Sequence, residues 1–131
     1  MAETPEHPSP GRGAVEAWRQ AFGLLGAPLS WMAFLLIDFA VADFGCGRVV
    51  GLRWWLILSA IVSTAVGALS WNIAYSAWRR TRHEARGGQT AAIEAGEGRS
   101  RFFAITGMLS AAIFTAASLF TLLSIAMVPP C

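Results

Sequence analysis

Two cysteines are the side chains in this sequence with the clearest chemistry. Cys46 follows the first long apolar segment, and Cys131 follows the last one. The membrane topology argued below puts both thiols on the same, oxidising side, where disulfides form and persist. We therefore predict a Cys46–Cys131 disulfide, which would close a loop of about 85 residues. Two free thiols, or a Cu(I) site built on the two sulfurs, are the alternatives, because thiolates select that ion.

Asp38 is the only acid within the apolar segment 21–42. An ionisable side chain inside a membrane is costly and is by default a candidate functional residue. The alternative is structural, namely that the carboxylate reaches the nearby membrane interface. If Asp38 stays inside, hydroxyls at the same depth are its expected partners: Ser59, Thr121 and Ser124.

Asn72 is a second polar side chain in an apolar segment. We expect it to hydrogen-bond across to the third segment, to Thr106 or Ser110, because amides and hydroxyls bind helices together inside membranes. A ligand or ion site is the alternative. Asp38 and Asn72 are thus the two intramembrane polar candidates.

Signatures of catalysis and cofactor binding are missing from the sequence. The two histidines, His7 and His83, lie outside the apolar segments, so they cannot build a bis-histidine haem site there. No Cys-x-x-Cys, phosphate-binding glycine loop or zinc-protease motif occurs. We predict no catalytic residue, no cofactor and no metal site, and the placement of the arginines does not indicate nucleic-acid binding.

Three uncharged or nearly uncharged segments must position these side chains. The chain is 55% hydrophobic and 14% charged, against about 25% charged in soluble proteins. Segments 21–42, 54–78 and 102–128 each exceed the roughly 20 residues that a helix needs to cross a bilayer. The sequence predicts an all-α membrane protein with three transmembrane helices, residues 18–131, preceded by a disordered Pro-rich tail, residues 1–17.

The distribution of arginine predicts the orientation. Eight arginines lie in the N-terminal region and the connector 79–101, and two, Arg48 and Arg53, lie in the other loop. Because basic residues mark the cytoplasmic side, we expect a cytoplasmic N-terminus and connector and a periplasmic C-terminus. The corresponding location is the bacterial cytoplasmic membrane, with the lipid bilayer as one partner.

Small residues recur every fourth position in two segments, which brings helix backbones close together. We expect these residues to pack the helices: Ser59, Ser63 and Gly67 in the second segment, and Gly107, Ala111 and Thr115 in the third. In the first segment, Pro28 lacks the N–H that would bond the carbonyl of Leu24. A neighbouring helix must therefore supply a donor to that carbonyl.

Several short motifs together resemble small three-helix membrane proteins found alongside bacterial haem–copper cytochrome c oxidases. The resemblance covers most of residues 20–131 and rests on Pro28-x-x-Trp31, Cys46, Trp78-Arg79-x-x-Arg82, Arg101-Phe102 followed by Gly107 and Ser110, and Pro129-Pro130-Cys131. It implies a non-catalytic accessory or assembly subunit of a larger respiratory membrane complex, without a redox centre of its own.

Two other functions remain open from the sequence. A small oligomeric transporter or channel component would use Asp38, with Arg48 and Arg53 at its mouth. A copper-delivery protein would need both cysteines for metal loading rather than for stability.

Overall fold

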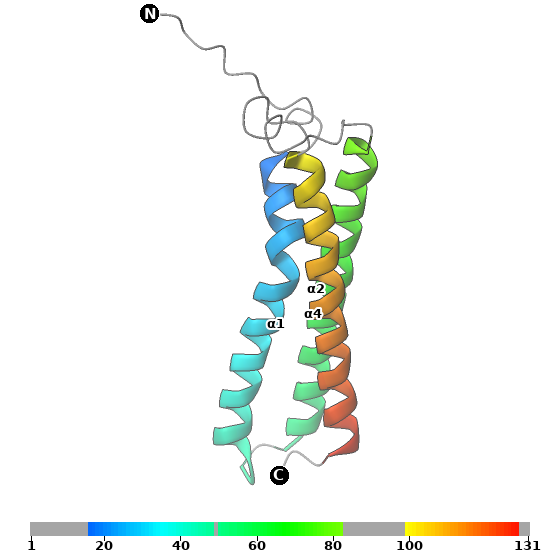
Figure 1. Ribbon diagram of the computed structural model, residues 1–131. Coiled ribbons are helices and arrows are strands. Elements are labelled where there is room, and N and C mark those ends of the chain that lie inside the picture. The colour runs from blue at the N-terminus through cyan, green and yellow to red at the C-terminus, as the bar shows by residue number, and fades with distance from the viewer. Residues whose placement is uncertain (1–15, 49, 83–98, 129–131) are drawn as a thin grey trace, which may run out of the picture.

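The protein is a bundle of three long helices (Figure 1). A computed structural model describes residues 16–48, 50–82 and 99–128, which form α1 (Ala17–Gly45), α2 (Leu52–Thr81) and α4 (Arg99–Met127). All three helices are long and apolar enough to cross a membrane. Residues 1–15 of the predicted tail, the middle of the connector and Cys131 lie outside the described residues, and α1 begins at Ala17, the last residue of the predicted tail.

The helices extend beyond the predicted segments at most of their ends. The expectation that the connector loop begins at residue 79 and ends at 101 is wrong at both ends, because α2 continues to Thr81 and α4 begins at Arg99. Arg79 and Arg80 occupy the last turn of α2, where positive charge interacts favourably with the helix dipole. Long basic side chains also reach water from such positions, so helical structure continues past the apolar segment.

The connection between α1 and α2 is a short turn that depends on two glycines. Gly47 and Gly51 have φ values of 76° and 86°, in the left-handed region that other residues rarely adopt. Gly51 is the N-cap of α2, and its carbonyl accepts hydrogen bonds from Trp54 N at 2.9 Å and Trp55 N at 3.2 Å. This turn starts α2 within a few residues of the end of α1, so the two helices lie antiparallel.

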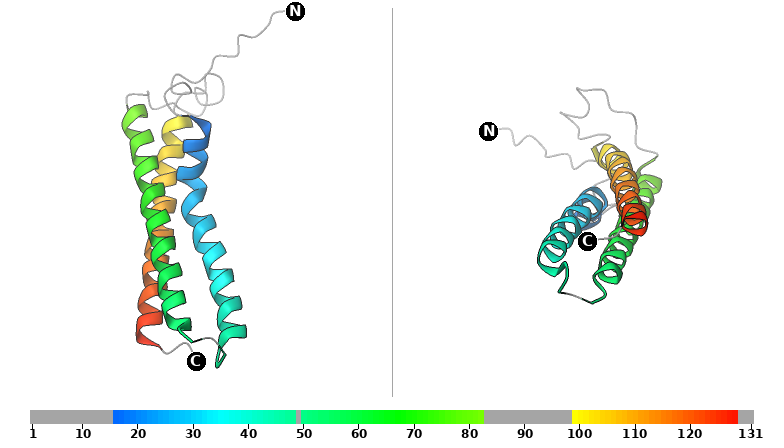
Figure 2. Two further views of the ribbon diagram at one scale, coloured as in Figure 1. Left: turned by 180° about the vertical axis from the view of Figure 1, so that it is seen from behind. Right: turned by 90° about the horizontal axis from the view of Figure 1, so that it is seen from below.

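Each pair of helices is in contact, but the packing is uneven along the bundle. Near the end that holds Ala17, Thr81 and Arg99, here called the Arg end, the three helices lie close together. Toward the opposite end, here called the Cys46 end, α1 diverges from α2 and α4 (Figures 1 and 2). More room is therefore left between α1 and the other two helices in the half of the bundle near Cys46.

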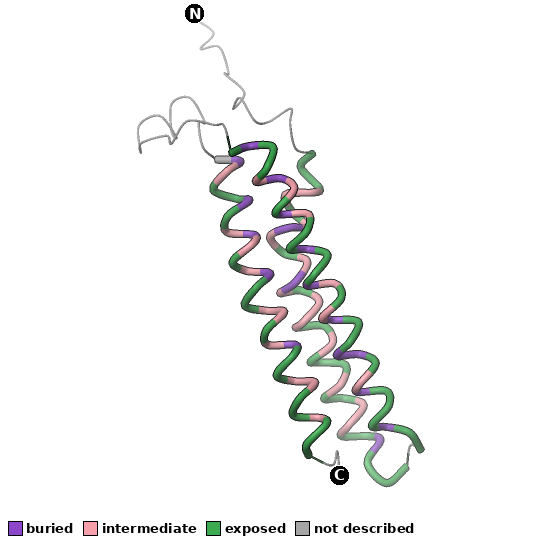
Figure 3. Tube along the Cα trace, turned by 90° about the vertical axis from the view of Figure 1, so that its right-hand side faces the viewer, coloured by how far each residue is buried: buried purple, intermediate pink, exposed green. Residues whose placement is uncertain are grey.

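Buried positions recur along each helix (Figure 3); small residues occupy most of them, and large apolar residues cover the outside. Most of the buried positions are alanine, glycine or serine, including Ala27, Ala60, Ala74, Ala77, Ala104, Ala111, Gly23, Gly67, Gly107, Ser63 and Ser70. Phe39 and Phe120, by contrast, are 74% and 69% exposed. This distribution suits a lipid environment, where van der Waals contact between small residues, rather than burial of large ones, holds helices together.

The closest approach of all three helices occurs at Gly23, Ala74 and Gly107. A Cβ atom on Gly107 would lie 3.0 Å from the Gly23 carbonyl oxygen and 3.3 Å from the Cβ of Ala74. A Cβ atom on Gly23 would also lie 3.3 Å from that of Ala74. Because the nearest obstacle to a larger residue at 107 is backbone rather than a movable side chain, glycine is needed there for α1 and α4 to touch.

The backbone gap created by Pro28 is closed by a neighbouring helix. Pro28 lies inside α1 and cannot donate to the carbonyl of Leu24. Ser110 of α4 donates its Oγ hydrogen to that carbonyl at 3.2 Å. The prediction that another helix supplies the missing donor is confirmed. Two residues closer to the Arg end, the Phe22 carbonyl accepts a hydrogen bond from Ser70 of α2 at 3.3 Å.

We expect the Ser110 hydrogen bond to stabilise the bundle only while Pro28 is present. Ser110→Ala should lower the free energy of unfolding by about 1 kcal/mol, the typical size of an interhelical hydrogen bond in a membrane. In a Pro28→Ala background the new N–H bonds the Leu24 carbonyl, so the same change should cost clearly less. Reversible unfolding in mixed detergent micelles of the two single variants and the double variant measures this coupling. Equal costs in both backgrounds would contradict it.

Candidate functional site

Asp38 of α1 and Ser59 of α2 form the central pair of the candidate site. Ser59 is buried and Asp38 is half-buried, and Ser59 Oγ donates to Asp38 Oδ2 over 2.6 Å. Ser59 Oγ also lies 2.8 Å from the carbonyl oxygen of Leu56. Of the three hydroxyls expected as partners if Asp38 stays inside, Ser59 is confirmed, whereas Thr121 donates to the Ala117 carbonyl of its own helix. Ser124 instead is exposed and donates to Phe120 of its own helix.

This geometry accommodates both protonation states of Asp38. An ionised carboxylate accepts the single hydrogen of the Ser59 hydroxyl. A protonated carboxyl can donate to Ser59 Oγ, which then donates to the Leu56 carbonyl, so every hydrogen has an acceptor. The pair can therefore take up or release a proton by rotating one hydroxyl, without moving either helix.

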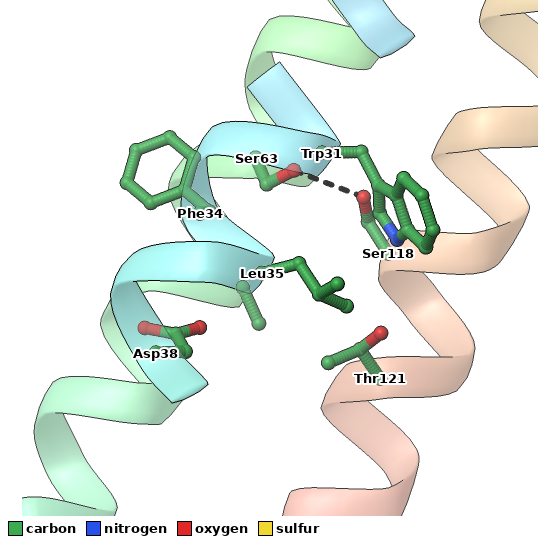
Figure 4. A pocket seen from close by; sticks show the side chains of 8 residues that line it. Trp31, Phe34, Leu35, Asp38, Ser63, Ser118 and Thr121 are labelled. Atoms are coloured by element: carbon green, nitrogen blue, oxygen red, sulfur yellow. Dashed lines mark hydrogen bonds between the residues drawn. The ribbon is translucent and has the colours of Figure 1, made fainter. Parts of the chain in front are cut away.

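A small cavity adjoins this pair in the half of the bundle where α1 diverges (Figure 4). Its volume is about 20 Å³. All three helices line it, with Trp31, Phe34, Leu35 and Asp38 from α1, Ala60 and Ser63 from α2, and Ser118 and Thr121 from α4. Its lining is mostly apolar but includes several polar atoms. What the cavity can bind therefore depends on which of these atoms still have a free hydrogen-bond donor or acceptor.

Two serines of the cavity wall join α2 to α4. Ser63 Oγ and Ser118 Oγ lie 3.0 Å apart, and Ser118 Oγ donates to the Phe114 carbonyl at 3.0 Å. A hydroxyl has one hydrogen, so Ser63 must be the donor to Ser118. Thr121 Oγ1 likewise donates to the Ala117 carbonyl of its own helix. The oxygens of Ser63 and Thr121 consequently remain available as acceptors.

The packing residues expected from the sequence lie between the helices. Ser59, Ser63 and Gly67 are buried on α2, and on α4 Gly107 and Ala111 are buried while Thr115 is half-buried. A Cβ atom on Gly67 would lie 3.2 Å from the Cβ of Thr115, so only glycine leaves room for that side chain. The two four-residue series therefore face each other along the contact between α2 and α4.

The expected hydrogen bond from Asn72 to the third helix is wrong. Asn72 is exposed and donates from Nδ2 to the Ala68 carbonyl of its own helix at 2.8 Å. Ser110, one of its two expected partners, instead bonds to α1 at Leu24. Position 72 points outward because the buried face of α2 passes through residues 70, 74 and 77. An amide that faces outward can satisfy one of its donors on its own backbone.

Arg53 has a structural partner at the Cys46 end. Its Nη2 donates to the carbonyl oxygen of Ala126 at 2.7 Å, joining the start of α2 to the end of α4. The carbonyls at a helix C-terminus lack partners within the helix and interact favourably with positive charge. Arg53 thus stabilises the end of α4.

The cysteines are only partly described. Cys46 lies exposed in the turn after α1, and Cys131 is outside the described residues, so the predicted disulfide stays a prediction. Among the side chains that the structure describes, no three His, Cys, Asp or Glu residues gather as a metal site would require.

Sequence reasoning missed two contributors to the cavity, Ser118 and Trp31. Ser118 follows Ala111 by seven residues, which returns it to nearly the same helix face, and this spacing could have been recognised. The Trp31 ring lies against α4, with its centroid 5.5 Å from that of Phe114. Nothing in the local sequence predicts that contact, because it depends on how α1 crosses α4.

No protein-family model, curated protein or solved structure matches this chain.

We expect Ser59→Ala to destabilise the bundle more than an equivalent change at an exposed serine. Removing the hydroxyl takes away the only donor to Asp38 Oδ2 among the described residues, at a cost of about 1–2 kcal/mol. Ser124→Ala is the matched control, because it removes only an intrahelical bond at an exposed position. Unfolding free energies of both variants in mixed micelles test this, and equal values would show that the Asp38–Ser59 bond contributes nothing.

Proposed function

We propose that the protein is a non-catalytic accessory or assembly subunit of a larger membrane complex, to which it docks through the outward faces of its helices. The resemblance described above favours a haem–copper cytochrome c oxidase of the bacterial cytoplasmic membrane as that complex. In this proposal the N-terminus is cytoplasmic, the C-terminus is periplasmic, and a Cys46–Cys131 disulfide holds the periplasmic end together.

The observation that supports this proposal best is the division between a small-residue interior and a large-residue exterior. Alanine, glycine and serine fill the interior, and even where α1 diverges the cavity beside Asp38 has a volume of only about 20 Å³. That volume is far below the 300–1,000 Å³ or so typical of small-molecule sites. Large apolar side chains, such as those of Phe39 and Phe120, are exposed on the outside of the bundle, where a partner helix or lipid can cover them.

Co-purification tests the proposal directly. The full chain, tagged and expressed at its native level, should bring large oxidase subunits and haem absorbance with it from a mild-detergent extract. A photoreactive phenylalanine analogue at the exposed position of Phe120 should cross-link to a partner subunit, whereas the analogue at Phe114, which packs on Trp31 of α1, should not. Isolation of the chain alone, or as a homo-oligomer without haem, would refute the proposal.

A small oligomeric transporter or channel component is the second candidate, and one observation favours it. Asp38 Oδ1 is buried and has no hydrogen-bond partner among the described residues, although it belongs to a side chain that lines the cavity. A carboxyl oxygen in that position could meet an ion or proton entering from the membrane interface.

Asp38→Asn separates the two candidates. An accessory subunit should assemble with its complex almost as the unmodified chain does, because asparagine can still bond to Ser59. A transporter should lose ion or proton flux into vesicles. Asp43→Asn is the matched control, since Asp43 is an exposed acid on the same helix. Loss of assembly specific to Asp38→Asn would contradict the prediction for the accessory subunit, and unchanged flux would contradict the transporter.

A further inference from the structure

The cavity beside Asp38 presents polar atoms that the protein does not satisfy by itself. Trp31 Nε1 and Asp38 Oδ1 are both buried and have no hydrogen-bond partner among the described residues. Burying an unbonded polar group costs a few kcal/mol in an apolar environment. Such groups are nearly always bonded, to protein or to ordered water. Two of them on the lining of one cavity therefore point to a ligand in that cavity.

The size of the cavity restricts what that ligand can be. To hold one water molecule, a cavity needs roughly 10–15 Å³ of space that the centre of the molecule can occupy. The volume here is about 20 Å³, which suits a water molecule and is too small for a lipid headgroup or quinone ring. The possible occupants are therefore water and a small ion.

The chemistry of the lining selects water over a cation. The Trp31 indole can only donate a hydrogen bond, and a cation cannot accept one. Trp31 lies against α4 through its contact with Phe114, and Figure 4 shows its nitrogen on the side of the ring toward Ser118 and Thr121. The hydroxyl of Thr121 has already donated its hydrogen to Ala117, so its oxygen is an acceptor. A molecule there must accept from Trp31 and donate to an oxygen, as water does.

We propose that this cavity is a hydration site, in which water accepts a hydrogen bond from Trp31 Nε1 and donates to Thr121 Oγ1. Ser63 Oγ, which donates to Ser118, provides another free lone pair. Buried waters typically make about three hydrogen bonds, a number that these groups can supply. The water would join α1 to α4 where the two helices no longer touch closely.

Nuclear magnetic resonance of the full chain in lipid nanodiscs tests this site. With ¹⁵N-labelled tryptophan, the Trp31 indole proton, assigned through its loss in Trp31→Phe, should show a direct nuclear Overhauser effect from a long-lived water. Thr121→Val removes the acceptor oxygen at nearly constant volume, so it should weaken or abolish that signal.

Thr64→Val is the matched control for Thr121→Val. Thr64 makes the same kind of bond, to the carbonyl four residues earlier, but is not part of the cavity lining. The signal should survive in Thr64→Val. Absence of a water signal at Trp31 in the folded protein, or equal signals in the two threonine variants, would overturn the proposal. A shift of the Trp31 resonance that requires added Na⁺ would overturn it in favour of an ion site.

Discussion

The requirement that polar groups inside the bilayer find partners within the bundle is the constraint on which the rest of this structure depends. Water does not compete for the backbone in the hydrocarbon region, so each free carbonyl or hydroxyl needs a donor or acceptor from the protein itself. Pro28 creates one such need at Leu24, and Ser110 of another helix meets it. This single bond fixes the relative position of α1 and α4 along their axes.

Close packing of small residues makes these cross-helix bonds possible. A serine side chain is short, so it reaches the backbone of a neighbouring helix only if the two helices nearly touch. Gly23, Ala74 and Gly107 provide that approach near the Arg end, where Ser70 and Ser110 bond to α1. Where α1 diverges, polar side chains bond one another instead, as Asp38 does with Ser59.

The divergence of α1 therefore creates a region with a distinct chemistry. Asp38 at one wall and Trp31 at another face a cavity of about 20 Å³ between the three helices. An accessory subunit gains from this arrangement a polar contact that fixes α1 in a single position while its outward face stays apolar. A transporter would use the same carboxyl for exchange, so the role of Asp38 is where the two proposed functions differ.

The sequence by itself determined that there are three membrane-crossing helices, because length and apolar composition alone set whether a segment can span a bilayer. It also indicated the small-residue faces, the need for a donor at Leu24, and Ser59 as one of three hydroxyls at the depth of Asp38, since each follows from spacing along one helix or from depth. The helix ends at Thr81 and Arg99 were not predictable, because helical hydrogen bonding continues past the apolar segment.

Only the tertiary structure decided that Asn72 faces outward, that Ser63 bonds Ser118 and that Trp31 reaches the cavity. Those outcomes depend on the rotation and crossing of each helix against the other two, which side-chain packing sets and local sequence does not.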